Sequence, residues 1–111
     1  RTDVMYQQPG TIYIYLIYGM YWMLNFVCEK ENNPQAVLIR AVEGFDGPGK
    51  LTKALQIDKT FNKQSICNNN RIMLFDDLYQ PDIIVAPRIG IDYAGKEWAE
   101  KPWRFIDKSL A

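Results

Sequence analysis

The side chains best suited to chemistry on a flat ligand lie in one uncharged stretch, residues 11–27, which reads TIYIYLIYGMYWMLNFV. Tyr18, Met20 and Tyr21 surround Gly19 near its middle, whereas turns usually carry Asn, Asp, Ser or Gly. We call these four residues the aromatic tip. Bulky side chains exposed on a rigid turn can insert between base steps and fill the gap left by an extruded nucleotide. The same residues can equally form only the rim of a hydrophobic core.

Two polar side chains interrupt otherwise apolar segments. Asn25 stands among Leu24, Phe26 and Val27, and it can fill a hydrogen-bond gap in a sheet or project into a pocket against the edge of a planar ligand. Arg40 stands inside AVLIRAV, where an arginine is rarely buried without a partner. It can form a structural ion pair, reach solvent, or hold a water or a carboxylate at the floor of a pocket.

Several kinds of chemistry are excluded by composition. The chain has no histidine, and Cys28 and Cys67 are far apart in sequence, so a zinc site and a Cys-His or Ser-His catalytic pair are not expected. We expect both thiols to be buried and reduced. Thirteen basic residues balance thirteen acidic ones in the 111 residues, so any contact with nucleic acid must come from a local patch.

The uncharged stretch must next be assigned to an element. A membrane-spanning helix needs about 20 mostly apolar residues, and the polar residues and turn formers at positions 7–10 shorten this stretch to the seventeen of residues 11–27. Side chains alternate with a period of two on both sides of Gly19, and Tyr, Ile and Trp favour strands. The pattern therefore predicts a β-hairpin rather than a membrane span.

The remaining segments predict a single mixed α+β domain over residues 1–111, with a largely antiparallel, curved β-sheet, a protruding hairpin and few short helices. The expected elements are a polar turn at 29–35 around Pro34, a strand at 36–43, a helix at 48–57, strands at 71–75 and 83–91, and a final strand within 94–107 that closes the core with Trp98, Trp103 and Phe105.

Four collinear blocks carry a resemblance that covers nearly the whole chain. The blocks PGTIYIYLIYGMYWMLNFV, AVLIRAVE, GPGKLTKALQI and APRIGIDYAGKEWAEKPWRF, preceded by RTDVMY, closely resemble the 3-methyladenine (alkyladenine) DNA glycosylase family. This resemblance implies removal of alkylated or deaminated purines by hydrolysis of the N-glycosidic bond, after the nucleotide is flipped out of the duplex. It implies a monomer that acts on double-stranded DNA with a damaged purine, needs no cofactor or metal and does not enter membranes. The implied location is the cytoplasm of a bacterium or the nucleus of a eukaryote.

The resemblance also implies roles for individual residues in binding DNA and the base. Tyr15 matches the tyrosine that stacks on the flipped base. Tyr18 matches the tyrosine that inserts into the minor groove, with Met20 and Tyr21 beside it. Asn25 matches the asparagine that crowds the 2-amino group of guanine and so discriminates against normal purines.

The catalytic part of the resemblance is incomplete. Arg40 matches the arginine that helps hold the attacking water, and Ile89 matches the residue whose main-chain carbonyl also contacts it. The family's general base is a glutamate in an ETEAY-like segment upstream, which these residues do not contain. The family also usually has a longer, charged insertion where this chain has only residues 43–47. A non-catalytic DNA-binding remnant, or an interaction fragment of such an enzyme, is therefore the alternative function, and an ETEAY-like stretch in the encoding gene would discriminate between the two.

Overall fold

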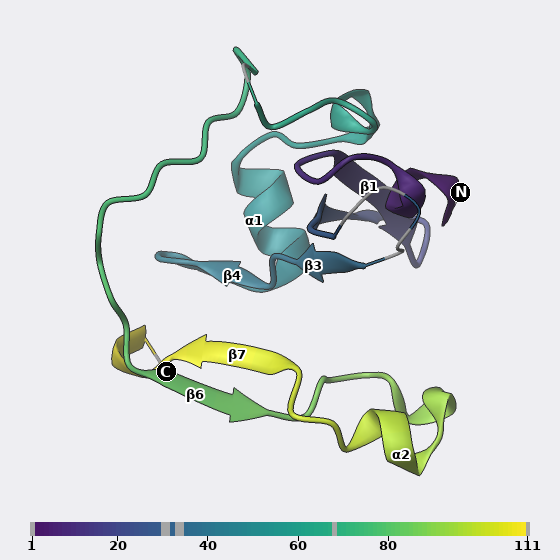
Figure 1. Ribbon diagram of the computed structural model, residues 1–111, viewed down its shortest axis with the longest axis vertical. Coiled ribbons are helices and arrows are strands. Elements are labelled where there is room, and N and C mark those ends of the chain that lie inside the picture. Colours follow the sequence, from purple (N-terminus) through teal and green to yellow (C-terminus); the bar gives the residue numbers. More distant parts are fainter. Residues whose placement is uncertain (1, 30–31, 33–34, 68, 111) are drawn as a thin grey trace. The chain divides into compact units, whose positions relative to one another are not determined.

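The structure is a computed structural model, and it describes residues 2–29, 32, 35–67 and 69–110. The chain forms two compact units, Arg1–Phe75 and Asp76–Ala111 (Figure 1). That residues 1–111 form one domain stays a prediction. No helix in the described ranges is long and apolar enough to cross a membrane.

The first unit is built on a three-stranded antiparallel sheet of order β1-β2-β3, with a separate two-stranded sheet of β4 and β5. Its elements are η1 (Thr2–Tyr6), β1 (Ile12–Ile17), β2 (Tyr21–Val27), β3 (Ala36–Leu38), β4 (Ala41–Val42), β5 (Phe45–Asp46), α1 (Pro48–Ala54) and η2 (Lys59–Phe61). The predicted hairpin in the uncharged stretch is confirmed, because β1 and β2 pair antiparallel from Ile12↔Phe26 to Ile17↔Tyr21.

The period of two along β1 and β2 gives the sheet two differently packed faces. On one face, Ile12, Ile14 and Leu24 are buried together with residues from α1 and η2. On the other face, Tyr13 and Val27 are buried in a smaller cluster with residues from η1. The strands are therefore covered on both sides, and Tyr15 packs against the smaller cluster.

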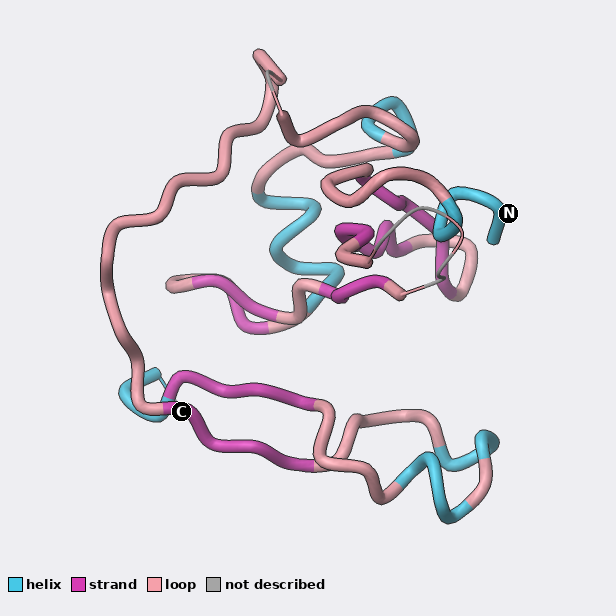
Figure 2. Tube along the Cα trace, viewed as in Figure 1, coloured by secondary structure: helices cyan, strands magenta, loops and turns pink. Residues whose placement is uncertain are grey.

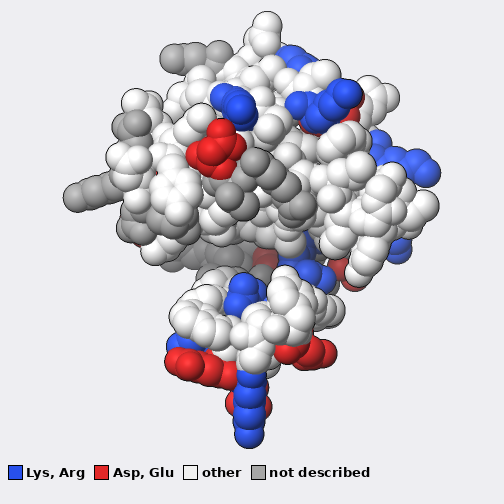
Figure 3. Space-filling view, turned by 90° about the vertical axis from the view of Figure 1, so that its right-hand side faces the viewer, with Lys and Arg blue, Asp and Glu red and all other residues white. Residues whose placement is uncertain are grey.

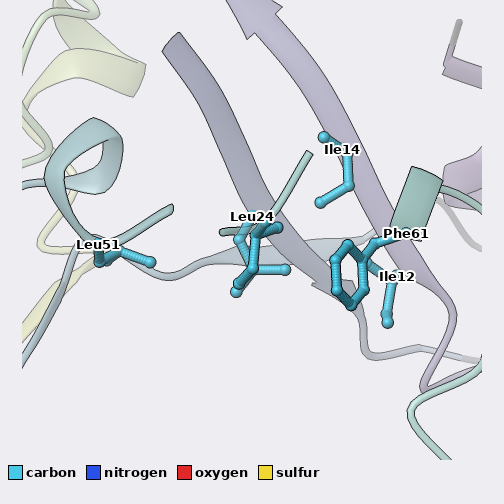
Figure 4. Packing of buried hydrophobic residues seen from close by; sticks show 6 residues of the cluster. Ile12, Ile14, Leu24, Leu51 and Phe61 are labelled. Carbon is cyan, nitrogen blue, oxygen red and sulfur yellow. The ribbon is translucent and has the colours of Figure 1, made fainter. Parts of the chain in front are cut away.

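The larger core cluster joins α1 and η2 to the hairpin. Figure 4 shows Phe61 of η2 beside Ile12 of β1, and Leu51 of α1 belongs to the same buried cluster as Leu24 of β2. Leu51 and Ile12 are fully buried, and each side chain of this kind stabilises the fold by about 1.5–3 kcal/mol relative to exposure. The short helix thus fixes the sheet from one side.

The helix predicted at 48–57 is confirmed but ends earlier, at Ala54. It begins with Pro48 in its first turn, where the missing N–H costs no hydrogen bond. Two residues after its end, Gln56 has a φ of 56°, which takes the chain out of the helical conformation. Ile57 lies beyond this turn and is buried in the core.

The single strand predicted at 36–43 is wrong in detail, because β3 ends at Leu38 and β4 begins at Ala41. The Ile39 N–H still donates to the Leu24 carbonyl of β2 (2.9 Å). After that bond the chain pairs β4 with β5 through a turn at Gly44, whose φ is 90°. Periodicity shows an apolar run but not a change of partner strand within it.

The strand predicted at 71–75 is also wrong, since these residues are in no strand. The backbone N–H groups of Arg71 and Ile72 donate to Asn69 Oδ1 (2.9 and 3.2 Å). The Arg71 guanidinium lies 3.8 Å from the centre of the Phe61 ring. Local side-chain contacts of this kind replace a strand ladder, and the three apolar residues that follow are exposed.

Two further expectations concern the burial of the cysteines and the polar turn at 29–35. The prediction that Cys28 and Cys67 are buried is wrong, because both are exposed. Cys28 directly follows the end of β2, and Cys67 lies in a turn where its N–H donates to Ser65 Oγ (3.0 Å). The polar turn predicted at 29–35 falls largely outside the described residues.

The second unit is a two-stranded antiparallel sheet with three short helical turns. Its elements are β6 (Ile83–Ala86), η3 (Asp92–Ala94), α2 (Lys96–Ala99), β7 (Arg104–Asp107) and η4 (Lys108–Leu110). Figure 2 shows β6 and β7 side by side, with the helical turns joined to them by loops. The strand predicted at 83–91 ends at Ala86, because Pro87 has no N–H to donate.

The predicted final strand is confirmed as β7, and the α+β fold class with antiparallel strands is confirmed by both units. The three aromatic residues expected to close the core do not do so within the second unit. Trp98 and Trp103 pack on each other with ring centres 5.8 Å apart and stay about half exposed, and Phe105 is more exposed still. A two-stranded sheet by itself is too small to bury such side chains.

Candidate nucleic-acid interface

The aromatic tip is a tight turn with an uncommon backbone. Tyr18 and Gly19 both have positive φ, 55° and 66°, and the Met20 N–H donates to the Ile17 carbonyl (3.1 Å). Two consecutive positive φ values are what a type I′ turn requires. A bulky residue such as tyrosine rarely adopts this conformation, and such outliers occur preferentially at functional sites.

The side chains of the tip are directed into solvent. Tyr18 is 83% exposed and Met20 is 64% exposed, whereas Tyr21, where β2 begins, is 45% exposed. Tyr18 therefore does not form the rim of a hydrophobic core. The tip is an uncharged, protruding aromatic surface supported by the paired strands β1 and β2.

Tyr15 lies below the tip on β1, in register with Met23 of β2. Its ring centre is 5.3 Å from that of Tyr13, with the two planes tilted by 45°. Tyr13 is buried and Tyr15 is partly buried, and both belong to the smaller cluster with Val4. Tyr15 thus has one side fixed by packing while part of its surface stays accessible.

Asn25 of β2 pairs with Tyr13 of β1, and Tyr13 and Tyr15 are two residues apart on the same strand. Asn25 therefore lies on the same face of the sheet as Tyr15. The side chain is 6% exposed, and its Nδ2 donates to the carbonyls of Tyr13 (3.2 Å) and Met23 (3.4 Å). These bonds fix the orientation of the amide. They agree with the interpretation in which Asn25 fills a hydrogen-bond gap in the sheet. They also hold a polar side chain rigidly on the face that carries Tyr15.

Arg40 lies at the break between β3 and β4 and is partly buried. Its carbonyl accepts a hydrogen bond from the Gly47 N–H (3.1 Å), which closes the small β4–β5 hairpin. The break places Arg40 outside the regular ladder of both sheets. An arginine in an irregular segment has more freedom to direct its guanidinium toward a ligand than one within a ladder.

Ile89 belongs to the second unit, in the loop after β6, and it is exposed. Two arginines that the sequence reasoning missed hold this loop. Arg104 of β7 donates from Nε to the Pro87 carbonyl (2.8 Å), and the Arg88 guanidinium lies 5.0 Å from the centre of the Trp103 ring. The sequence gives little indication of these two contacts, because basic residues near aromatic ones are common on protein surfaces. The role of the Ile89 carbonyl stays a prediction.

Charged side chains of both signs lie on the surface of the described residues (Figure 3). Figure 3 shows one face, on which basic and acidic side chains are scattered among uncharged ones. A hydrogen bond from the Thr60 hydroxyl lowers the pKa of Asp58, and one from the Ser109 hydroxyl lowers the pKa of Asp107. Both carboxylates serve local turns. Within the described ranges, no three His, Cys, Asp or Glu side chains gather where a metal ion could be held.

Comparison with curated proteins finds relatives along nearly the whole chain. A protein of Borrelia garinii is 45% identical over 120 residues, with 97% of this chain and 64% of the relative covered. A protein of Methanocella arvoryzae is 41% identical over 129 residues, with 98% and 64% covered, and one of Wolbachia pipientis is 45% identical over 118 residues, with 100% and 62% covered. Each bears the name "Putative 3-methyladenine DNA glycosylase".

The chain therefore spans somewhat less than two thirds of the length of these relatives. The Borrelia garinii alignment, 120 residues long, exceeds the 111 residues of this chain, so that relative has residues with no counterpart here. The family model for methylpurine-DNA glycosylase (MPG) matches residues 1–46 and 44–110, two segments that meet where the resemblance implies a longer insertion. With nearly every residue matched, the chain belongs to the methylpurine-DNA glycosylase family.

Proposed function

We propose that this chain forms the DNA-inserting and base-recognising part of a DNA glycosylase that flips alkylated or deaminated purines out of double-stranded DNA and hydrolyses their N-glycosidic bond. One observation carries the proposal. Tyr18 is 83% exposed on a turn with positive φ, in a chain that belongs to a glycosylase family. An exposed aromatic residue on a strained, rigid turn has no role in the core, whereas it suits insertion into a base stack.

Insertion of the aromatic tip would replace the stacking that the flipped nucleotide loses. Opening one base pair costs a few kcal/mol, and less for a damaged base, which gives some selectivity before any bond is broken. Tyr18 has the area to fill the gap, while the exposed Met20 and Tyr21 would contact the flanking groove. No charged side chain occurs from Val4 to Cys28, so the hairpin enters the stack without carrying an ion out of water.

The flipped base would stack on Tyr15, whose ring is held in place by Tyr13. A purine alkylated on a ring nitrogen carries positive charge, and an electron-rich tyrosine face favours such a cation over a neutral base by about 1–2 kcal/mol once both are desolvated. The same charge makes the base a good leaving group. Binding and bond cleavage would thus favour the same damaged bases.

Asn25 would exclude normal guanine from this position. Its amide is held by two carbonyls of the sheet, so it cannot move away from an approaching 2-amino group without losing these hydrogen bonds. Adenine, hypoxanthine and their alkylated forms have no amino group at that edge. Discrimination therefore comes from a rigid neighbour rather than from an added attraction.

The hydrolytic step needs a positioned water and a base to accept its proton. The family resemblance assigns the holding of the water to Arg40 and to the main-chain carbonyl of Ile89, and the proposal keeps both roles. Glu29, Glu31 and Glu43 match no catalytic position, so the general base is proposed to be a glutamate outside these residues. Such a base contributes about 10²–10⁴-fold to the rate.

The test is Tyr18→Ala in the full-length protein, with Tyr93→Ala as the matched control. Tyr93 is an equally exposed tyrosine at 87%, and it lies in the second unit. Tyr18→Ala should weaken binding to a lesion-containing duplex by about 1–3 kcal/mol, as for loss of one stacked base, with an unchanged melting temperature. Tyr93→Ala should bind normally. Early melting of Tyr18→Ala with normal DNA binding would show that the tip serves the fold and that the proposal is wrong.

A further inference from the structure

The second residue of α1 is in unusually close contact with the aromatic tip. Gly49 has no side chain, and a methyl group in its place would lie 2.7 Å from Cδ1, 3.1 Å from Cγ and 3.3 Å from Cβ of Tyr21. Such distances are shorter than van der Waals contact between carbon atoms allows. Because the base of the tyrosine side chain is involved, rotation of the ring alone would not relieve the overlap.

The backbone gives no other reason for a glycine at this position. Gly49 is part of α1 and is not among the glycines with positive φ. Glycine is less favourable than alanine in a helix, since it loses more backbone freedom on folding. The close approach of Tyr21 is therefore the feature that requires glycine.

A second residue of α1 contacts the next residue of β2. Thr52 is 2% exposed, and its hydroxyl donates to the Trp22 carbonyl (Oγ1–O 2.8 Å). The same oxygen lies 3.1 Å from the Gly49 carbonyl, so the bond also ties the first turn of the helix to the strand. Leu51 of the helix and Leu24 of β2 belong to the same buried cluster. The helix thus contacts β2 immediately beside the turn.

We propose that Gly49 and Thr52 are positioning residues that set the direction of the aromatic tip by holding Tyr21 and Trp22 against α1. The turn that directly precedes Tyr21 is short and is closed by the hydrogen bond from the Met20 N–H to the Ile17 carbonyl, so a shift of Tyr21 is passed on to Tyr18. The functional part of this inference rests on the proposed insertion of the tip into DNA. The structural part, the coupling of α1 to the tip, does not.

The coupling is tested without DNA by the methyl signals of methionine. In the full-length protein labelled with 13C-methyl methionine, Gly49→Ala should shift the Met20 signal and leave that of Met73 unchanged. In a Tyr21→Ala background, Gly49→Ala should no longer shift the Met20 signal, because the overlapping side chain is gone. An unchanged Met20 signal in Gly49→Ala, or the same shift in both backgrounds, would overturn the inference.

The effect on function is tested with the same variants on a duplex that contains hypoxanthine. Gly49→Ala should weaken binding by about 10-fold, within the usual range for coupled neighbours, and change the single-turnover rate at saturating enzyme by less than about twofold. In the Tyr21→Ala background the same substitution should have no further effect on the Kd. Ala54→Ser, an exposed change at the other end of α1, is the matched control and should behave as wild type.

Thr52 gives an independent pair of variants in case Gly49→Ala does not fold. Thr52→Val keeps the shape but removes the hydroxyl, and it should weaken binding to the same duplex. Thr52→Ser keeps the hydroxyl and should bind the duplex with wild-type affinity. Wild-type affinity in Thr52→Val would overturn the role of Thr52. If the wild-type protein itself fails to bind the duplex, the proposed function is wrong, whereas the Met20 signal still decides whether α1 positions the tip.

Discussion

Asn25→Ser separates the selectivity of the site from its stability. The substitution removes most of a side chain that is 6% exposed and that donates to the carbonyls of Tyr13 and Met23. Serine is too short to reach both carbonyls. It therefore removes the two hydrogen bonds and also opens the face of the sheet on which Tyr15 lies.

The magnitude of each effect follows from the contacts. The two hydrogen bonds are 3.2 and 3.4 Å long and share one nitrogen, so their loss should cost about 1–2 kcal/mol in the free energy of unfolding. Removal of steric overlap with the 2-amino group should raise excision of guanine relative to hypoxanthine by about 10–200-fold, the range for small steric differences in a pocket. Excision of hypoxanthine itself should change little.

The assay is single-turnover excision of guanine, hypoxanthine and 3-methyladenine from otherwise identical duplexes, by the full-length protein well below its melting temperature. Thermal melting of the same sample measures the loss of stability separately. A protein that melts earlier but keeps the wild-type ratio of guanine to hypoxanthine excision would refute the reasoning. Asn25 would then be a structural residue of the sheet alone.

Three further predictions follow from other parts of the chain. Residues 1–111 alone should excise bases about 10²–10⁴-fold more slowly than a longer polypeptide that includes an ETEAY-like segment; equal single-turnover rates would mean that a general base lies within this chain. Leu51→Ala should lower the free energy of unfolding by about 2–5 kcal/mol, measured by urea denaturation, because Leu51 is fully buried between α1 and the sheet. The hydrogen bonds from Thr60 lower the pKa of Asp58, so their stabilisation is present above about pH 4 and is lost as the pH falls through the folded-state pKa. Asp58→Asn should remove this acid-dependent part of the melting temperature, and an unaltered pH profile would contradict it.

The sequence predicts those elements whose signals are local. The hairpin follows from alternation around Gly19, and α1 follows from Pro48 and the apolar positions after it. The strand expected at 71–75 fails because an apolar run does not specify a partner strand. The break at Arg40 is missed for the same reason, since the chain there changes from one sheet to another.

The candidate site is predictable only in part. The exposed aromatic residues of the tip are recognisable because their types are wrong for an ordinary turn, but whether they face solvent depends on the whole fold. The contact between Gly49 and Tyr21 joins two elements that are far apart in sequence, so no local pattern reveals it. The exposure of Cys28 and Cys67 likewise depends on where the strand and turn end.

The pairing of β1 with β2 has a consequence for how the protein can change over time. Tyr15 and Asn25 share one face of the sheet, while Ile14 and Leu24 share the other, and both sets are fixed by the same register. Insertion or deletion of one residue within either strand would turn the residues of that strand beyond the change onto the opposite face, so that a group proposed to face the ligand entered the core and a core group replaced it. Such a change would disturb both the packing of the core and the proposed recognition of the base. Substitutions can therefore alter the side chains of this surface one at a time, whereas a change in strand length disrupts the surface and the core together. Selection for a stable core thus also preserves the register that places Tyr15 and Asn25 on one face.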